Sequence, residues 1–177
     1  MCTVQIQRTA AIVHPALPTL RPHELTAVLL QFAGTNVAAA ELKSFYFTAQ
    51  QHALTLLPSC SLQQVADITW ALHRAQAAVS AAFYKHVTDF AATWLEQRLV
   101  EEDTLHVGVP IQPDTRSLTH SNLGSKKLNC DIAQEAANFL YRIRHIADVR
   151  EALGGGIITG MLRIVSKGAS HVRPCLL

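Results

Sequence analysis

Apolar residues recur every three or four positions along several segments of the chain, a spacing that places them on one face of an α-helix. One stripe runs from Leu62 to Ala75 and a second from Val79 to Trp94. Ser61 and Gln64 lie at the start of the first stripe in the Ser-x-x-Gln order of a capping box, which satisfies free N–H groups at a helix start. The pattern therefore predicts a pair of helices between Ser61 and about residue 100.

The same pattern occurs about 40 residues earlier, where residues 21–32 align with residues 61–72. Pro22 falls in the first helical turn, where its missing N–H group costs nothing. Gly34-Thr35-Asn36 then separates this helix from a second one, whose apolar stripe runs from Leu42 to Leu56. These residues predict an earlier copy of the helix pair.

A third, degenerate copy follows, in which residues 135–144 align with residues 64–73 and Tyr141 takes the place of Trp70. Asp131-x-x-Gln134 is its candidate cap, and Gly154-Gly155-Gly156 is the expected break between its two helices. Because a lone helix pair cannot bury both of its faces, neighbouring pairs must stack. We therefore expect an all-α fold, a short α-solenoid of about three copies, or a compact bundle if the third copy folds back.

Residues 101–128 interrupt the pattern, because Gly108, Pro110 and Pro113 occur there without an apolar stripe. Five parts are expected along the chain. They are an N-terminal extension at 1–19, two helix-pair repeats at 20–100, a polar loop or arm at 101–128, the third degenerate repeat at 129–167, and a C-terminal tail at 168–177.

Residues 61–75, Ser-Leu-Gln-Gln-Val-Ala-Asp-Ile-Thr-Trp-Ala-Leu-His-Arg-Ala, resemble the octotricopeptide-type helical repeat of organellar RNA-binding proteins. They are also similar to repeats of FAST-kinase-like and RAP-domain proteins. Those repeats follow Pro-Gln-(Glu/Asp)-Leu-Ala-Asn-x-x-Trp-Ala-x-Ala, and the positions that keep this pattern are Gln64, Ala66, Asp67, Trp70 and Ala71. The sequence departs from it at Leu62, where proline is common, and at Arg142, where alanine is usual. The resemblance covers residues 20–100 well and 130–167 poorly. It implies a role in mitochondrial or plastid RNA processing, translation or ribosome-type assemblies.

The N-terminal segment adds a hint about location. No acidic residue precedes Glu24, whereas Arg8 and Arg21 are present, a bias that mitochondrial transit peptides share. We expect a mitochondrial protein with a targeting-derived extension; an ordinary N-terminus is the alternative.

The four cysteines are scattered, without the close spacing of a zinc site, and are expected to be reduced thiols. No apolar run reaches the roughly 18 residues of a membrane span, so we expect a soluble intracellular chain.

Charge is distributed unevenly along the chain. Up to residue 115 there are six Lys and Arg residues against nine Asp and Glu, and from Arg116 onward there are nine against four. Clustered positive charge is what sequence-independent phosphate binding requires. The candidate RNA-binding residues are Lys126, Lys127, Arg142, Arg144, Arg150, Arg163 and Lys167. A solvated surface is the alternative for these side chains. Trp70 and Tyr141 can either stack bases or pack in the core.

Catalytic chemistry has little support in the sequence. The nine histidines form no HExxH or similar cluster, and Gly154 to Gly160 lacks the glycine spacing and the Gly-Lys-Ser/Thr sequence of a phosphate loop. We therefore expect no catalytic residues, metal, cofactor or small-molecule substrate. The sequence favours a non-catalytic helical-repeat subunit that binds RNA or a ribonucleoprotein, with RNA and protein subunits as its partners. The alternative is a protein-binding scaffold subunit of a large assembly without direct RNA contact.

Overall fold

The computed structural model describes residues 3–35, 39–106 and 118–171 of the chain. Side chains are described within 3–35, 40–100 and 130–167. Every regular element in these ranges is helical, which confirms the all-α prediction. The α-helices are α1 (Thr3–Val13), α2 (Pro22–Ala33), α3 (Lys43–Leu56), α4 (Leu62–Arg74), α5 (Ala81–His106), α6 (Leu118–Ile143) and α7 (Ala147–His171). The 3-10 helices are η1 (His14–Thr19), η2 (Ala39–Leu42) and η3 (Leu57–Ser59).

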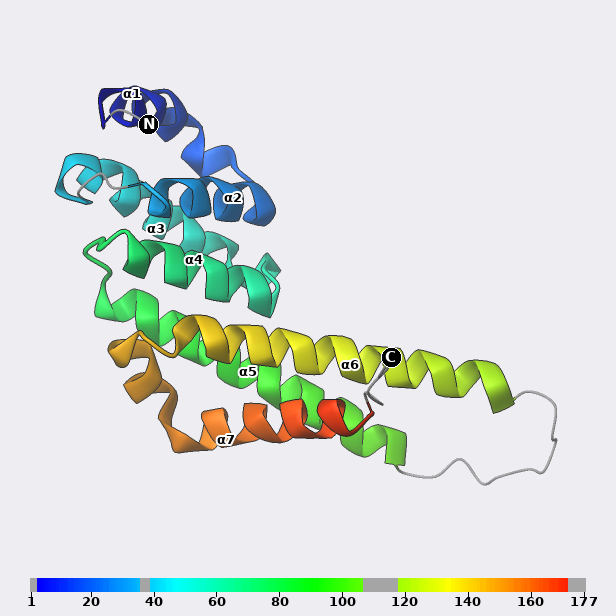
Figure 1. Ribbon diagram of the computed structural model, residues 1–177. Helices are drawn as coiled ribbons and strands as arrows, with labels where there is room; N and C mark the ends of the chain where they lie inside the picture. The colour runs from blue at the N-terminus through cyan, green and yellow to red at the C-terminus, as the bar shows by residue number, and fades with distance from the viewer. Residues whose placement is uncertain (1–2, 36–38, 107–117, 172–177) are drawn as a thin grey trace, which may run out of the picture.

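The helices lie one below another along the molecule (Figure 1). Helix α4 packs between α2 and α6, while α7 packs on both α5 and α6. Helices α4 and α6 run in the same direction, so their C-terminal ends lie at the same side of the molecule (Figure 1). This arrangement places the last turns of α4 and α6 next to each other.

Helix α4 has the start and the buried face that its sequence predicts. The Ser61 hydroxyl accepts a hydrogen bond from the Gln64 backbone N–H at 3.2 Å, and the Gln64 side chain accepts one from the Ser61 N–H at 2.9 Å. The capping box is therefore confirmed. The stripe residues Leu62, Val65, Ile68 and Leu72 are fully buried, and Ala75 is half-buried.

The first helix pair is also confirmed in its main features. Pro22 is the first residue of α2, which ends at Ala33, just before Gly34. On α3, Phe45, Ala49 and Ala53 are buried, as their spacing predicts. Asn36 lies outside the described residues.

The N-terminal segment 1–19 was expected to be an extension of the repeats, and its described part is packed into the fold. Helix α1 contributes Ile6 and Ala10 to the hydrophobic core, and η1 contributes Leu17, which is fully buried. Element η1 packs against both α1 and α3. Residues 3–19 therefore cover the end of the helical stack.

The prediction of a polar loop at 101–128 is wrong at both ends of that range. Helix α5 continues to His106, and α6 begins at Leu118. The residues on which the loop prediction rested, Gly108, Pro110 and Pro113, all lie in 107–117, outside the described residues. Acidic residues such as Glu101 and Glu102 are compatible with a helix, so their polarity gave a misleading signal.

Two further boundaries differ from expectation. Asp131 lies inside α6 and therefore does not cap a helix start. The turn between α6 and α7 falls at residues 144–146, because Ile146 N–H bonds to the Ile143 carbonyl there. The glycine run also breaks the helix, as expected, because Gly154 inside α7 takes φ 65° and ψ 166°, a conformation that favours glycine, and two helical segments meet there.

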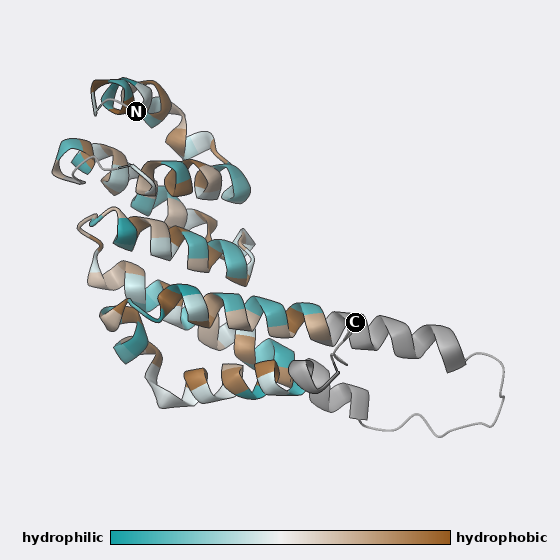
Figure 2. Cartoon of the chain, in the orientation of Figure 1, coloured by the Kyte–Doolittle hydropathy of each residue, from teal (hydrophilic) through white to brown (hydrophobic). Residues whose placement is uncertain are grey.

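Hydrophobic and hydrophilic residues alternate along the helices instead of forming one continuous apolar segment (Figure 2). Within the described ranges, no helix combines the length and the hydropathy needed to cross a membrane.

Candidate functional site

An arginine joins the ends of α4 and α6. The Arg142 Nε atom, in the last turn of α6, lies 2.9 Å from Oδ1 of Asp67 on α4. The same guanidinium group lies over the ring of Trp70, 4.7 Å from its centroid. Arg142 therefore contacts two residues that are three positions apart on one face of α4.

The carboxylate of Asp67 is almost fully buried and is held from both sides. Its Oδ2 atom accepts a hydrogen bond from Nε2 of Gln63 at 2.8 Å. Its Oδ1 atom makes no hydrogen bond within the described residues, so its contact with Arg142 is an ion pair without hydrogen-bond geometry. Burying this carboxylate without a counter-charge would be costly, and the arginine offsets that cost.

A similar arrangement occurs on α6. The Gln134 Nε2 atom donates to Oδ1 of Asn138 at 2.9 Å, and Tyr141 follows three residues later. The Arg144 guanidinium lies over the Tyr141 ring at 3.9 Å from its centroid. Its Nε atom donates to Nε2 of His145 at 2.7 Å, so that ring nitrogen carries no proton in this arrangement.

The two helices therefore carry one repeated polar and aromatic face. The repeat alignment that places Tyr141 over Trp70 also places Asn138 over Asp67 and Gln134 over Gln63. In both helices the Gln side chain donates to the residue four positions later. Sequence reasoning missed the Gln63–Asp67 and Gln134–Asn138 pairs, although extending the alignment by one residue would have revealed them.

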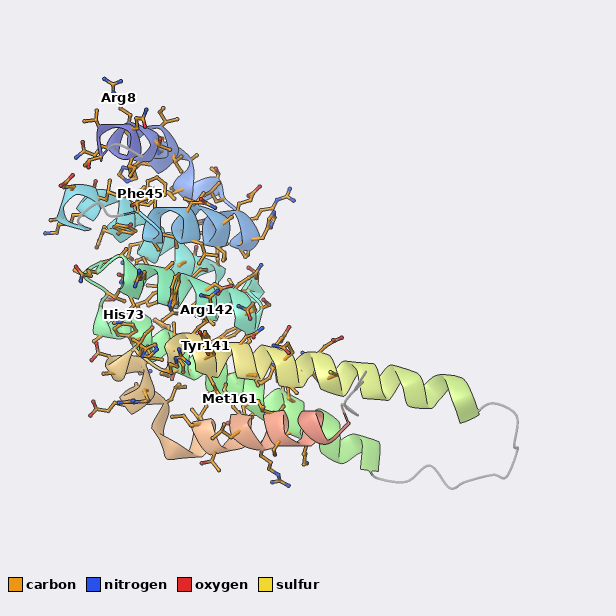
Figure 3. The ribbon with its side chains drawn as sticks, viewed as in Figure 1. Arg8, Phe45, His73, Tyr141, Arg142 and Met161 are labelled. Carbon is orange, nitrogen blue, oxygen red and sulfur yellow. The ribbon has the colours of Figure 1, made fainter. Side chains whose placement is uncertain are left out.

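Two of the predicted RNA-binding residues lie where α6 ends, Arg142 in its last turn and Arg144 in the turn that follows it. Figure 3 shows Arg142 and Tyr141 near the ends of α4 and α6, at the side of the molecule where His73 lies. Arg142 is half-buried and ion-paired, whereas Arg144 is exposed.

The other predicted basic residues are distributed along two helices. Arg150, Arg163 and Lys167 are exposed on α7. Lys126 and Lys127 belong to α6, but their side chains lie outside the described residues.

The two aromatic candidates differ in exposure. Trp70 is half-buried at the edge of the core, and Tyr141 is 59% exposed. An arginine covers one ring face of each. The face that an arginine occupies is not available to a stacking base.

Two other features offer little chemistry. An open groove of about 720 Å³ lies between η2, the start of α3 and the α4–α5 connection, lined by Ala40, Glu41, Lys43, Ser44, Tyr46, Phe47, Gln50, Gln76, Ala77 and Ala78. Burial raises the pKa of the Cys60 thiol to about 11, which keeps it protonated and unreactive at neutral pH. No group of three or more His, Cys, Asp or Glu residues in the described part is arranged to hold a metal ion.

No protein-family model matches this chain, and neither the curated proteins nor the solved structures include one with significant similarity to it.

Proposed function

We propose that this chain is a short α-solenoid that binds single-stranded RNA without catalysing a reaction, as part of a mitochondrial ribonucleoprotein. The solenoid interpretation is supported by the packing order, because α4 packs between α2 and α6, and α7 packs on α5. The repeated face on α4 and α6 adds support, since equivalent side-chain pairs form at equivalent positions.

The observation that carries RNA binding is the charge of the last two helices. Residues 118–171 contain seven Lys and Arg residues against four Asp and Glu. Arg144, Arg150 and Arg163 are exposed. Exposed positive charge distributed over the α6–α7 turn and along α7 suits a polyanion better than a single small anion. The mitochondrial location rests on the resemblance to organellar repeats and on the acid-poor N-terminal sequence.

The test is a titration of a fluorescent single-stranded RNA against the purified full chain at several salt concentrations. Affinity should fall as salt rises, with a log–log slope of about 0.7 for each phosphate contact. Changing Arg144, Arg150 and Arg163 together to Gln should weaken binding and flatten this slope. The matched control changes Arg8 and Arg21, which are exposed but lie outside the basic half. If wild type does not bind at low salt, direct RNA binding by this chain is refuted.

A protein-binding scaffold is the second candidate, and exposed apolar side chains favour it. At the N-terminal end of the stack, Val4 is 52% and Ile12 is 78% exposed on α1. Tyr141 on α6 is 59% exposed, whereas its equivalent on α4, Trp70, is half-buried. Apolar docking does not weaken with salt as phosphate binding does, so the same salt series on co-purified partners separates the two functions.

A further inference from the structure

Arg142 and Arg144 are held in the same way by different residues. Each guanidinium lies on an aromatic ring, Trp70 for Arg142 and Tyr141 for Arg144. The Nε atom of Arg142 is ion-paired with Oδ1 of Asp67, and the Nε atom of Arg144 donates a hydrogen bond to Nε2 of His145. Within the described residues, neither guanidinium makes another hydrogen bond or ion pair. The terminal Nη groups of both arginines are therefore available to a ligand.

An arginine fixed in this way is well suited to an oxyanion. The guanidinium group presents its N–H groups as a planar fork that matches two oxygens of a phosphate. A free arginine side chain loses rotamer freedom when it binds, whereas one already held by a ring and an Nε partner loses less. Asp67 offsets part of the positive charge around Arg142, and Trp70 restricts the movement of its side chain. Together they leave the Nη edge of Arg142 pre-oriented.

We propose that Arg142 and Arg144 form a phosphate-binding fork for the backbone of single-stranded RNA, with Asp67 and Trp70 as positioning residues (Figure 3). This inference rests on the proposed RNA-binding function and narrows it. The aromatic rings support the arginines and do not stack bases on the faces that the arginines cover. The fork therefore recognises the ribose-phosphate backbone, and it tolerates any base sequence.

The first experiment asks whether bases are needed. A single-stranded RNA and an abasic phosphodiester oligomer of the same length are titrated against the full chain at low salt. Phosphate recognition predicts affinities within about threefold of each other, because the two oligomers share the backbone that the fork contacts. A loss of more than about tenfold for the abasic oligomer would overturn the inference and leave RNA binding intact.

The second experiment separates positioning from simple charge. Asp67→Asn removes a negative charge beside the fork, so electrostatics alone predicts tighter RNA binding. Positioning predicts the opposite, a weakening of about three- to tenfold, because Arg142 loses its orienting partner. The matched control is Asp89→Asn, which removes the same charge from an exposed ion pair with Lys85 on α5. This control should bind RNA as wild type does or slightly more tightly.

Two measurements keep the outcome interpretable. The Arg142 side-chain resonances should be shifted by the Trp70 ring current in wild type and less so in Asp67→Asn, which reports orientation without ligand. If Asp67→Asn fails to fold, Trp70→Phe and Trp70→Leu replace it, since the first keeps an aromatic face under Arg142 and the second does not. Equal RNA affinity of these two variants, or tighter binding by Asp67→Asn, overturns the inference. Absence of any RNA binding by wild type overturns both the fork and the proposed function.

Discussion

Helices α4 and α6 carry the same short pattern on one face but differ in their surroundings. In α4, the aromatic residue Trp70 is half-buried, and the arginine over it comes from the neighbouring helix. In α6, the equivalent Tyr141 is 59% exposed, and the arginine over it comes from the turn that follows its own helix. Helix α4 has packed helices on both sides in its layer, α2 and α6. Helix α6 also packs against two helices, α4 and α7, so the difference lies in the contact that Arg142 makes with Trp70 from the neighbouring helix, and not in the number of neighbours.

This difference gives the same residue position two roles. On α4 the face helps to hold two helices together, because Arg142 joins Asp67 and Trp70 across the interface. On α6 the residues that correspond to Asp67 and Trp70 are Asn138, which is half-buried, and Tyr141, which is exposed. An equal substitution at equivalent positions should therefore have unequal effects.

The largest difference is expected between Trp70→Ala and Tyr141→Ala. Trp70→Ala should lower the free energy of unfolding by about 2–4 kcal/mol, somewhat below the cost for a fully buried aromatic because Trp70 is half-buried, and the loss includes the contact with Arg142. Tyr141→Ala should cost less than about 1 kcal/mol, since the ring is exposed. Denaturant unfolding of both variants measures the difference. Equal losses would mean that the two faces are buried alike in solution, which would contradict the comparison.

The next difference concerns two thiols, Cys60 just before α4 and Cys130 within α6. Burial raises the pKa of Cys60 from 9.0 to about 11, and Cys130 is exposed. The unfolded chain then loses the Cys60 proton at lower pH than the folded chain does. Stability from this thiol is therefore fully present below pH 9 and is lost as the pH rises through 11.

Unfolding free energies measured between pH 8 and 11 check this expectation. The decline should be shallower in Cys60→Ala than in wild type, and Cys130→Ala is the control that removes an exposed thiol. Tyr46 and Tyr84, whose pKa values burial also raises, contribute equally in all three proteins. A Cys130→Ala slope as shallow as that of Cys60→Ala would contradict the assignment of this pH dependence to the burial of Cys60.

The sequence predicted helices, buried stripes and the α4 cap because each depends on residues close together in the chain. Ser61 and Gln64 are three residues apart, and the stripe from Leu62 to Leu72 lies within one helix. The ion pair between Asp67 and Arg142 depends on packing between residues far apart in the chain, so composition and periodicity do not reveal it. Arg142 was therefore grouped with other surface charges, although the fold uses it at an interface.

Boundaries were predicted less well where polarity was read as loop. The acidic residues after Val100 and the polar residues after Leu118 belong to helices whose length the pattern did not reveal. Asp131 and Gln134 matched a cap only by spacing, and a cap requires the chain to enter the helix there. The α4 and α6 copies therefore agree in their faces and differ in their starts.

That difference in helix start predicts a moderate effect. Ser61→Ala should cost about 1 kcal/mol, because it removes the side-chain acceptor for the Gln64 N–H. Asp131→Ala should be close to neutral, since Asp131 is exposed inside α6 and alanine is the better helix former. Thermal unfolding of the two variants measures the contrast. A loss of about 1 kcal/mol or more from Asp131→Ala would indicate that a helix does start near that residue.

The smallest difference is expected between the two glutamines of the repeated face. Gln134→Ala removes an exposed side-chain hydrogen bond, which stabilises a helix by about 0.2–0.5 kcal/mol. Alanine regains a similar amount through its higher helix propensity, so this change should be nearly neutral. Gln63→Ala gains the same propensity, but it takes away a donor from the buried Asp67 carboxylate, which costs about 1–3 kcal/mol. Gln63→Ala should therefore be the more destabilising of the two, by about 1 kcal/mol. If the two variants unfold at the same denaturant concentration, Asp67 is not buried in solution and Arg142 is not held there.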